Sequence, residues 1–183
     1  MQLRTLTALL ATGLVGVQAA PAATTEDVLS GLNPVYARVV DKGIISYYAA
    51  GPVDFDFDNA WKNPVDFDTV AASAPAVQKR CGSNQVHCAG DNLARSSVCE
   101  NFTNSLIRNP GVPIDIGVGA ILYSEGTFNC VIKWEDRVAN MVQGYLIGAA
   151  QATLRRCGAG VTVSGWVTDV SLNNVCTTQK MFA

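Results

Sequence analysis

The sequence predicts an α+β protein, an antiparallel sheet with two main helices packed on one face and stapled by three disulfides. The first observation behind this prediction is the order of periodic segments after residue 81, which runs helix, hairpin, helix, strand. The second is the presence of six cysteines in a chain of 183 residues that begins like a secretory signal. An even number of cysteines in a secreted chain is typical of a disulfide framework, so we expect all six to be paired.

The N-terminus predicts export from the cell. Residues 1–4 form a short positive segment, residues 6–17 are apolar, and small residues stand at Val17 and Ala19, where a signal peptidase requires them. This apolar segment is shorter than the roughly 20 residues of a membrane-spanning helix. We therefore interpret residues 1–19 as a removable signal peptide, expect no transmembrane segment, and expect the mature chain to be extracellular.

Two regions of different character follow the signal peptide. Residues 20–80 are acidic and free of cysteine, with three basic and eight acidic side chains up to residue 77. Residues 81–183 carry every cysteine, and the stretch from residue 78 to residue 183, which includes Lys79 and Arg80, is mildly basic. Neither charge is large enough to indicate a nucleic-acid partner. We predict an acidic N-terminal region and a six-cysteine α+β domain, and the first of these is also a candidate pro-segment.

The acidic region begins with a predicted β-hairpin. Residues 35–40 and 44–48 are rich in β-branched and aromatic side chains, and the Asp-Lys-Gly sequence at 41–43 fits a three-residue turn.

Residues 53–58 then alternate strictly between apolar and acidic side chains. This pattern predicts a half-buried strand whose aspartates face water. The aspartates also suggest calcium binding, but Asn59 stands where an EF-hand loop requires glycine, and Val65 stands where it requires glutamate. Weak calcium binding stays open as an alternative, although we predict no metal site and no cofactor. The three aspartates are Asp54, Asp56 and Asp58.

The cysteine-rich region contains two predicted helices. The first starts at Asp91, a possible cap, and ends at the Asn-Pro-Gly sequence of 109–111. The second runs from about residue 135 to residue 157, where its apolar positions recur at helical spacing. Gly144 and Gly148 lie one turn apart in this helix, and we expect them to let it approach a sheet closely.

Strands are predicted between and after these helices. One hairpin turns at residues 124–126, and the final strands lie within residues 160–172. The cysteines are distributed over all these elements, and six of them allow fifteen pairings, among which spacing alone does not choose. The predicted disulfide cysteines are Cys81, Cys88, Cys99, Cys130, Cys157 and Cys176.

Two short motifs predict processing. Asn101 opens an N-glycosylation sequon, Asn-Phe-Thr, within the first helix. Lys79 and Arg80 form a dibasic pair directly before the first cysteine, and a Kex-type protease that cuts after Lys-Arg would remove the acidic region. A similar pair at 155–156 lies inside a predicted helix, so a chance occurrence at 79–80 stays open as well.

The sequence predicts no catalytic residue. His87 is the only histidine of the chain, and we interpret it as a polar loop residue. A zinc site built from Cys81, His87 and Cys88 lacks the usual spacing and a fourth ligand. Pairs of carboxylates such as Asp54 and Asp56 are what a glycosidase requires, but no pattern places them in a cleft.

Three stretches of the cysteine-rich region resemble the fungal WD-like domain family of small secreted proteins. The likeness covers roughly residues 80–180 and rests on cysteine spacing and on the C-terminal motif. It departs at Lys180, where the family has a further cysteine, so the family's pairings do not transfer. A weaker likeness in element order is to the α/β sandwich of the killer toxin encoded by a smut-fungus virus. The stretches are RCGSNQVHCAGDNLARSSVC, NCVIKW and VSGWVTDVSLNNVCTTQ.

These observations predict a secreted, disulfide-stabilised, non-enzymatic binding protein that is effector-like or toxin-like. Its expected partner is an extracellular protein, a glycan or a membrane-protein target. Two alternatives stay open, a small secreted hydrolase that uses carboxylates and a structural protein associated with the cell wall.

Overall fold

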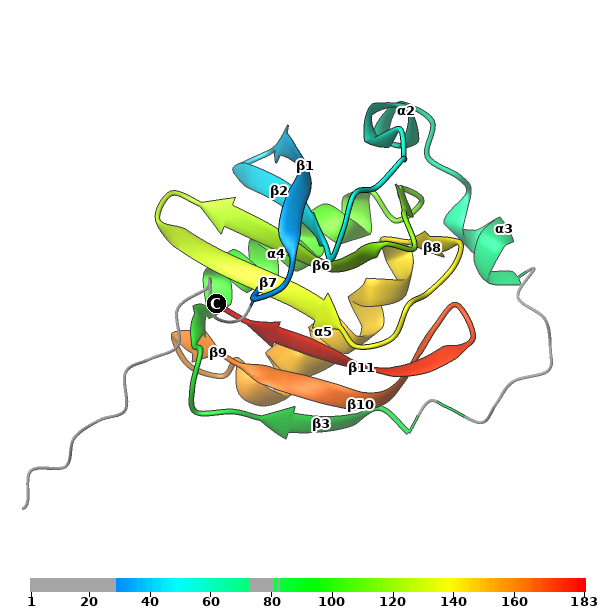
Figure 1. Ribbon diagram of the computed structural model, residues 1–183. Coiled ribbons are helices and arrows are strands. Elements are labelled where there is room, and N and C mark those ends of the chain that lie inside the picture. The colour runs from blue at the N-terminus through cyan, green and yellow to red at the C-terminus, as the bar shows by residue number, and fades with distance from the viewer. Residues whose placement is uncertain (1–28, 73–80, 82) are drawn as a thin grey trace, which may run out of the picture.

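The computed structural model describes residues 29–72, 81 and 83–183, and it confirms the α+β prediction (Figure 1). A large antiparallel sheet carries two main helices on one face. The predicted signal peptide, residues 1–19, and the dibasic pair at 79–80 lie outside the described residues, so both stay predictions.

Seven strands make up the main sheet, and all neighbouring strands are antiparallel. In chain order they are β1 (Asn33–Val40), β2 (Gly43–Ala49), β3 (Gln85–Cys88), β6 (Val118–Glu125), β7 (Phe128–Trp134), β10 (Gly165–Leu172) and β11 (Val175–Phe182). Across the sheet the order is β1-β2-β6-β7-β11-β10-β3. The two strands of the acidic region therefore form one edge, and β3 forms the other.

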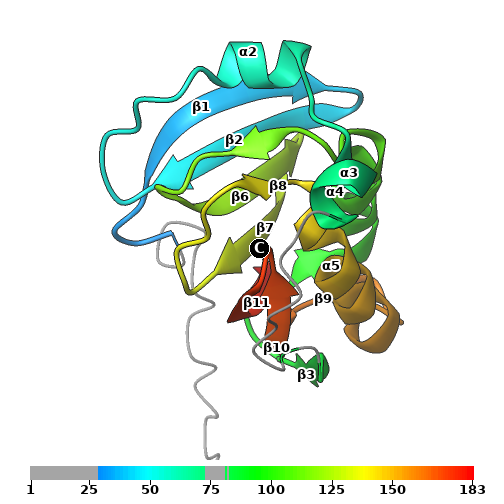
Figure 2. The ribbon, with the colours of Figure 1, turned by 90° about the vertical axis from the view of Figure 1, so that its right-hand side faces the viewer.

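The two main helices lie side by side on one face of this sheet (Figure 2). They are α4 (Ser96–Arg108), which contacts β6 and β7, and α5 (Gly144–Cys157), which contacts β10, β11 and β3. Among the described residues, no helix covers the opposite face, which we call the helix-free face. Two short ladders complete the fold, β4 (Ala94–Arg95) with β9 (Thr162–Val163) and β5 (Pro113–Ile114) with β8 (Met141–Val142).

Apolar side chains fill the space between the sheet and the helices. The rings of Phe102 on α4 and Tyr123 on β6 stack at 5.6 Å, and both residues are buried. A second, smaller apolar cluster lies on the other side of the sheet, where the Leu29–Leu32 turn covers part of the helix-free face. Its buried members are Leu29, Ala120, Leu122, Val131 and Phe182.

The acidic region is built into this fold. The predicted hairpin forms as β1 and β2, and β2 pairs with β6 over six residues, from Ile44 opposite Ser124 to Ala49 opposite Val118. Helix α3 (Phe67–Ala72) packs at the margin of the core, where the partly buried Phe67 ring meets Tyr145 of α5 edge-on at 5.5 Å. Residues of the acidic region and of the six-cysteine region thus share one sheet and one core.

The strand predicted at residues 53–58 is not formed. Helix α2 (Phe57–Lys62) begins within this stretch, because the Asp56 carboxylate accepts a hydrogen bond of 2.9 Å from the backbone N–H of Asn59 and so caps it. The Phe57 ring is buried and stacks on Tyr36 at 4.9 Å. The alternating pattern therefore comes from a capped helix start whose phenylalanines pack inward.

Both main helices are shorter than predicted. Helix α4 begins at Ser96 after Arg95, so Asp91 does not cap it, and α5 begins at Gly144. Nor do the two glycines of α5 face a sheet. Gly148 has open space beside it, and a side chain at Gly144 would meet the ring of Phe67 from α3.

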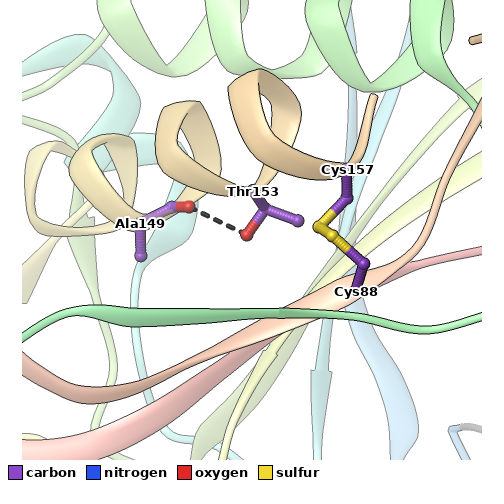
Figure 3. The surroundings of a disulfide bond; sticks show 4 residues. All are labelled: Cys88, Ala149, Thr153 and Cys157. Atoms are coloured by element: carbon purple, nitrogen blue, oxygen red, sulfur yellow. Dashed lines mark hydrogen bonds between the residues drawn. A yellow bond between two sulfur atoms is a disulfide. The ribbon is translucent and has the colours of Figure 1, made fainter. Parts of the chain in front are cut away.

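One disulfide, Cys88–Cys157, joins edge strand β3 to the C-terminal end of α5 (Figure 3). The two Cα atoms are 5.3 Å apart, within the usual range for a bridge. Thr153 lies one turn earlier and donates its hydroxyl hydrogen bond to the Ala149 carbonyl at 3.0 Å. Gly165 of β10 fits beneath them, since a Cβ there would lie 2.5 Å from the His87 carbonyl and 3.1 Å from the Cys157 sulfur.

The second disulfide, Cys99–Cys130, joins α4 to β7 inside the core, with a Cα separation of 5.3 Å. The remaining cysteines, Cys81 and Cys176, lie near each other. A third disulfide between them stays a prediction of the six-cysteine framework. No described helix is long and apolar enough to cross a membrane.

Candidate functional site

A groove of about 600 Å³ lies on the helix-free face, over β7, β10 and β11. This volume falls within the roughly 300–1,000 Å³ of small-ligand pockets. Strand side chains form most of it, and the segment that leads into β4 closes one side. We call it the helix-free groove, and its lining residues are Ala89, Asp91, Asn92, Lys133, Glu135, Ser164, Gly165, Trp166, Thr168, Thr178, Lys180 and Phe182.

One row of side chains crosses the sheet at this groove. The strand register places His87 opposite Trp166, Trp166 opposite Lys180, and Lys180 opposite Lys133. Side chains opposite one another in a sheet point to the same face, and the next residue along each strand points to the other. Met181, which follows Lys180, is buried beneath the helices, so the row itself points to the helix-free face.

An aromatic pair forms one end of the row. The rings of His87 and Trp166 stack with centroids 5.2 Å apart and planes inclined by 16°. This separation is close to the spacing between strands, as expected for side chains of opposed residues on neighbouring strands. One face of the indole is covered by the imidazole. On the side of β10 away from β3 lies β11, whose Thr178 and Lys180 line the groove.

Charges of both signs form the other end. Lys133 and Lys180 lie opposite each other across two strands, an arrangement of like charges that destabilises a sheet. Glu135 relieves it by forming a 2.8 Å ion pair with Lys180. Both partners of this ion pair are about half exposed, so it adds little stability. With Asp91, the lining carries two cations and two carboxylates and has no net charge.

A β-bulge in β10 shapes the side of the groove that Thr168 lines. Two residues of β10, Thr168 and Asp169, stand opposite the single residue Thr178 of β11. Asp169 has a φ of 58°, a left-handed conformation that a non-glycine residue rarely adopts. Its carboxylate accepts a hydrogen bond from the backbone N–H of Ser83 at 3.1 Å, which anchors the chain beside the bulge. Bulges of this kind occur often beside binding sites, where they redirect a side chain.

The segment between β3 and β4 forms another side of the groove, through Ala89, Asp91 and Asn92. The backbone N–H of Ala89 donates to the Ser164 carbonyl, and the Asn92 carbonyl accepts from the N–H of Ala183, both at 2.9 Å. Asn92 adopts a φ of 49°. Its side-chain Oδ1 is buried and has no hydrogen-bond partner within the described part of the chain. A buried acceptor of this kind favours a donor from water or a ligand.

His87, predicted as a loop residue, lies on strand β3 and is exposed beside the groove. Residues 85–88 form a short edge strand because they pair with β10, although their sequence has weak strand propensity.

The sequon residue Asn101 lies on α4 and is half buried. Its Nδ2 donates to Glu125 of β6 at 2.8 Å, and the hydroxyl of Thr103 is buried and donates to the Cys99 carbonyl. Glycosylation of Asn101 stays a prediction, and it would modify the same Nδ2 atom that donates to Glu125.

The three aspartates of the acidic region lie outside the groove lining. Asp56 caps α2, Asp58 accepts a 2.8 Å hydrogen bond from the Tyr36 hydroxyl, and Asp54 is exposed. Across residues 29–72, 81 and 83–183, no three histidine, cysteine or acidic side chains come together as a metal ion would require.

Sequence reasoning missed the groove. Trp166, Lys133 and Lys180 each stand within an alternating strand, so their outward orientation could have been predicted from the period of two. Their proximity could not, because it depends on the register between strands that are far apart in the chain.

No family model, no curated protein and no solved structure matches this chain. The likeness to the fungal WD-like domain family therefore stays a prediction based on cysteine spacing and the C-terminal motif.

Proposed function

We propose that this protein is a secreted, disulfide-stabilised binding protein without catalytic activity, effector-like or toxin-like, which recognises an extracellular target through the helix-free groove. The observation that carries the proposal is the groove itself. It presents a tryptophan and four charged side chains on a face that no described helix covers. Concave sites with an aromatic surface and a few fixed polar groups are typical of ligand recognition.

The rigidity of the groove supports this function. Strands β7, β10 and β11 are interior strands, each paired on both sides. The Cys88–Cys157 bridge ties neighbouring β3 to α5 beneath them. A site on such strands loses little conformational entropy when it binds, so more of the contact energy appears as affinity. The two disulfides also suit an oxidising, extracellular environment.

The hydrolase alternative has one observation in its favour, because Asp91 and Glu135 line the same groove. Two carboxylates that flank a bond are what glycoside hydrolysis requires. Incubation with glycan, lipid and peptide substrates separates the two functions. Turnover that is lost in Asp91→Asn, Glu135→Gln or His87→Ala would contradict the binding proposal.

The direct test measures adsorption of fluorescently labelled protein to intact cells and to isolated cell walls. Thr178 lines the groove and lies on the less buried face of β11, so Thr178→Arg places a bulky side chain in the groove without touching the buried face of that strand. Thr127→Arg places the same side chain in the exposed β6–β7 turn and serves as the matched control. We expect saturable adsorption that Thr178→Arg abolishes and Thr127→Arg retains. Adsorption that both variants retain would exclude the groove, and adsorption released by salt from walls alone would favour the structural alternative.

A further inference from the structure

We propose that the ligand of the helix-free groove is an uncharged oligosaccharide, with one sugar ring packed on the exposed part of the Trp166 indole. This inference rests on the proposed binding function and names the chemical class of its ligand. Its first support is the fixed orientation of the indole. The His87 ring stacks on the indole at 5.2 Å, and Trp166 itself lines the groove.

A sugar ring matches that surface in shape and in polarity. One face of a pyranose is made of C–H groups, which pack on the negative face of an aromatic ring, while its hydroxyls project from the rim. Trp166 offers such a face and is only half buried, so it can still gain contacts when a ligand binds. The apolar ring of Phe182 lines the same groove. Phe182 lies two residues beyond Lys180 on β11, opposite Val131 of β7.

The charges around the indole indicate that the ligand is neutral. The two lysines of the groove are balanced by Asp91 and Glu135, so a polyanion gains no net attraction from the site. Hydroxyl groups, in contrast, both donate and accept hydrogen bonds. A polyhydroxylated ligand can therefore use the ammonium groups as donors and the carboxylates as acceptors, and such charge-assisted bonds are stronger than neutral ones.

The position of the groove argues against an extended peptide as the ligand. A peptide strand that adds to a sheet requires the unpaired backbone groups of an edge strand. The groove lies over β7, β11 and β10, and the backbone of each of these strands already pairs on both sides. The ligand is therefore recognised through side chains that rise from the sheet, a mode that suits rings with many hydroxyls.

The test titrates the disulfide-intact protein with neutral oligosaccharides and follows tryptophan fluorescence and calorimetric heat. The probes are hexamers of β-1,4-linked glucose, β-1,4-linked N-acetylglucosamine, β-1,3-linked glucose and mannose, with oligogalacturonate and heparin as charged comparisons. We expect at least one neutral hexamer to bind saturably with little dependence on salt. Trp166→Ala should weaken this binding by about tenfold or more, since one stacked aromatic ring contributes about 1 kcal/mol or more.

Two further variants keep the result interpretable. Trp61→Phe changes a tryptophan of α2 that does not line the groove, and it should retain both the affinity and the fluorescence change. Thr178→Arg leaves the indole in place and blocks the space beside it, so it should also abolish binding even if Trp166→Ala does not fold.

Each contrary outcome overturns the inference in a distinct way. If no neutral hexamer binds while adsorption to cells still depends on Thr178, the ligand is a protein or lipid and the proposed binding function stands alone. Binding of the charged oligosaccharides only, lost at high salt, would assign the groove to polyanions. Neutral binding that survives both Trp166→Ala and Thr178→Arg would place the sugar site elsewhere.

Discussion

One strict packing requirement on a single residue lies at Gly165, where β10 passes close to the backbone of β3 and to the Cys88–Cys157 bridge. A methyl group there would lie 2.5 Å from the His87 carbonyl oxygen, which belongs to a paired strand and cannot easily move. We predict that Gly165→Ala lowers the free energy of unfolding by about 1–3 kcal/mol, the usual range for overpacking.

The matched control is Gly148→Ala, which has open space beside it on α5. Because alanine has the higher helix propensity, this variant should be more stable by about 0.5–1 kcal/mol. Urea denaturation of both proteins measures the difference. Equal stabilities for Gly165→Ala and the unmodified protein would show that β3 does not approach β10 this closely.

A second prediction at the residue scale concerns a buried hydrogen bond. The Gln143 side chain donates its Nε2–H to the Tyr47 hydroxyl, and both residues are fully buried. Replacing Tyr47 with phenylalanine leaves that donor without an acceptor and should lower the free energy of unfolding by about 1–3 kcal/mol at neutral pH.

The same tyrosine makes stability depend on alkaline pH. Burial raises the pKa of Tyr47 well above its ordinary value of 10.0. The unfolded chain therefore releases this proton as the pH rises above about 10, while the folded protein holds it. The contribution of the protonated Tyr47 to the free energy of unfolding is fully present below that pH and is lost progressively above it. Tyr47→Phe should fall less steeply in urea melts between pH 9 and about 11, although burial also raises the pKa of Tyr36, Tyr123 and Tyr145. An unchanged slope would contradict the burial of Tyr47.

At the scale of elements, the disulfides differ in exposure and should differ in their order of reduction. Cys99 and Cys130 are fully buried between α4 and β7, whereas Cys88 is exposed on edge strand β3. A thiol reagent needs access to sulfur, so we expect mild reductant to open Cys88–Cys157 first and Cys99–Cys130 only on unfolding.

Differential alkylation followed by peptide mapping checks this order. Without reductant, the same maps should recover peptides of Cys81 and Cys176 linked to each other, the third bridge of the predicted framework. Loss of both described bridges at one rate would contradict the difference in burial. Reduction of Cys88–Cys157 should also lower the free energy of unfolding by about 4 kcal/mol, given a loop of 69 residues.

Elements with local signals could be predicted from the sequence, and those that depend on distant partners could not. The hairpins at 41–43 and 124–126 form because turn residues separate two β-rich runs. The alternation of apolar and acidic residues at 53–58 led to the wrong prediction of a strand. An aspartate that caps a helix looks the same in sequence as one that faces water from a strand. The disulfide pairing and the groove depend on register across the sheet, on which no short stretch of sequence gives information.

At the scale of the whole molecule, the charge difference between the acidic region and the rest does not mark a boundary in space. Ile45, Tyr47 and Ala49 of β2 are fully buried against the elements that follow residue 81. Asp41 of the β1–β2 turn forms an ion pair with Arg108 of α4, which links the two regions at the surface. A chain that starts at residue 81 would expose the β6 edge and the residues that these side chains cover.

The same packing connects the acidic region to the groove. Leu29 and Tyr48 pack in the cluster on the helix-free face that also contains Phe182, and Phe182 lines the groove. Removal of the acidic region would therefore uncover one wall of the proposed binding site.

The central claim is that the acidic region and the six-cysteine region form one folded unit. The native mass of protein cut after Arg80 tests this claim most directly. Native mass spectrometry and size exclusion should find the two pieces together, because β2 pairs with β6 and three buried side chains hold it there. They should separate only in denaturant, since the acidic region contains no cysteine to retain it covalently. Release of the N-terminal piece under native conditions, leaving a folded remainder that still binds its target, would contradict the single-sheet fold and make the acidic region a pro-segment.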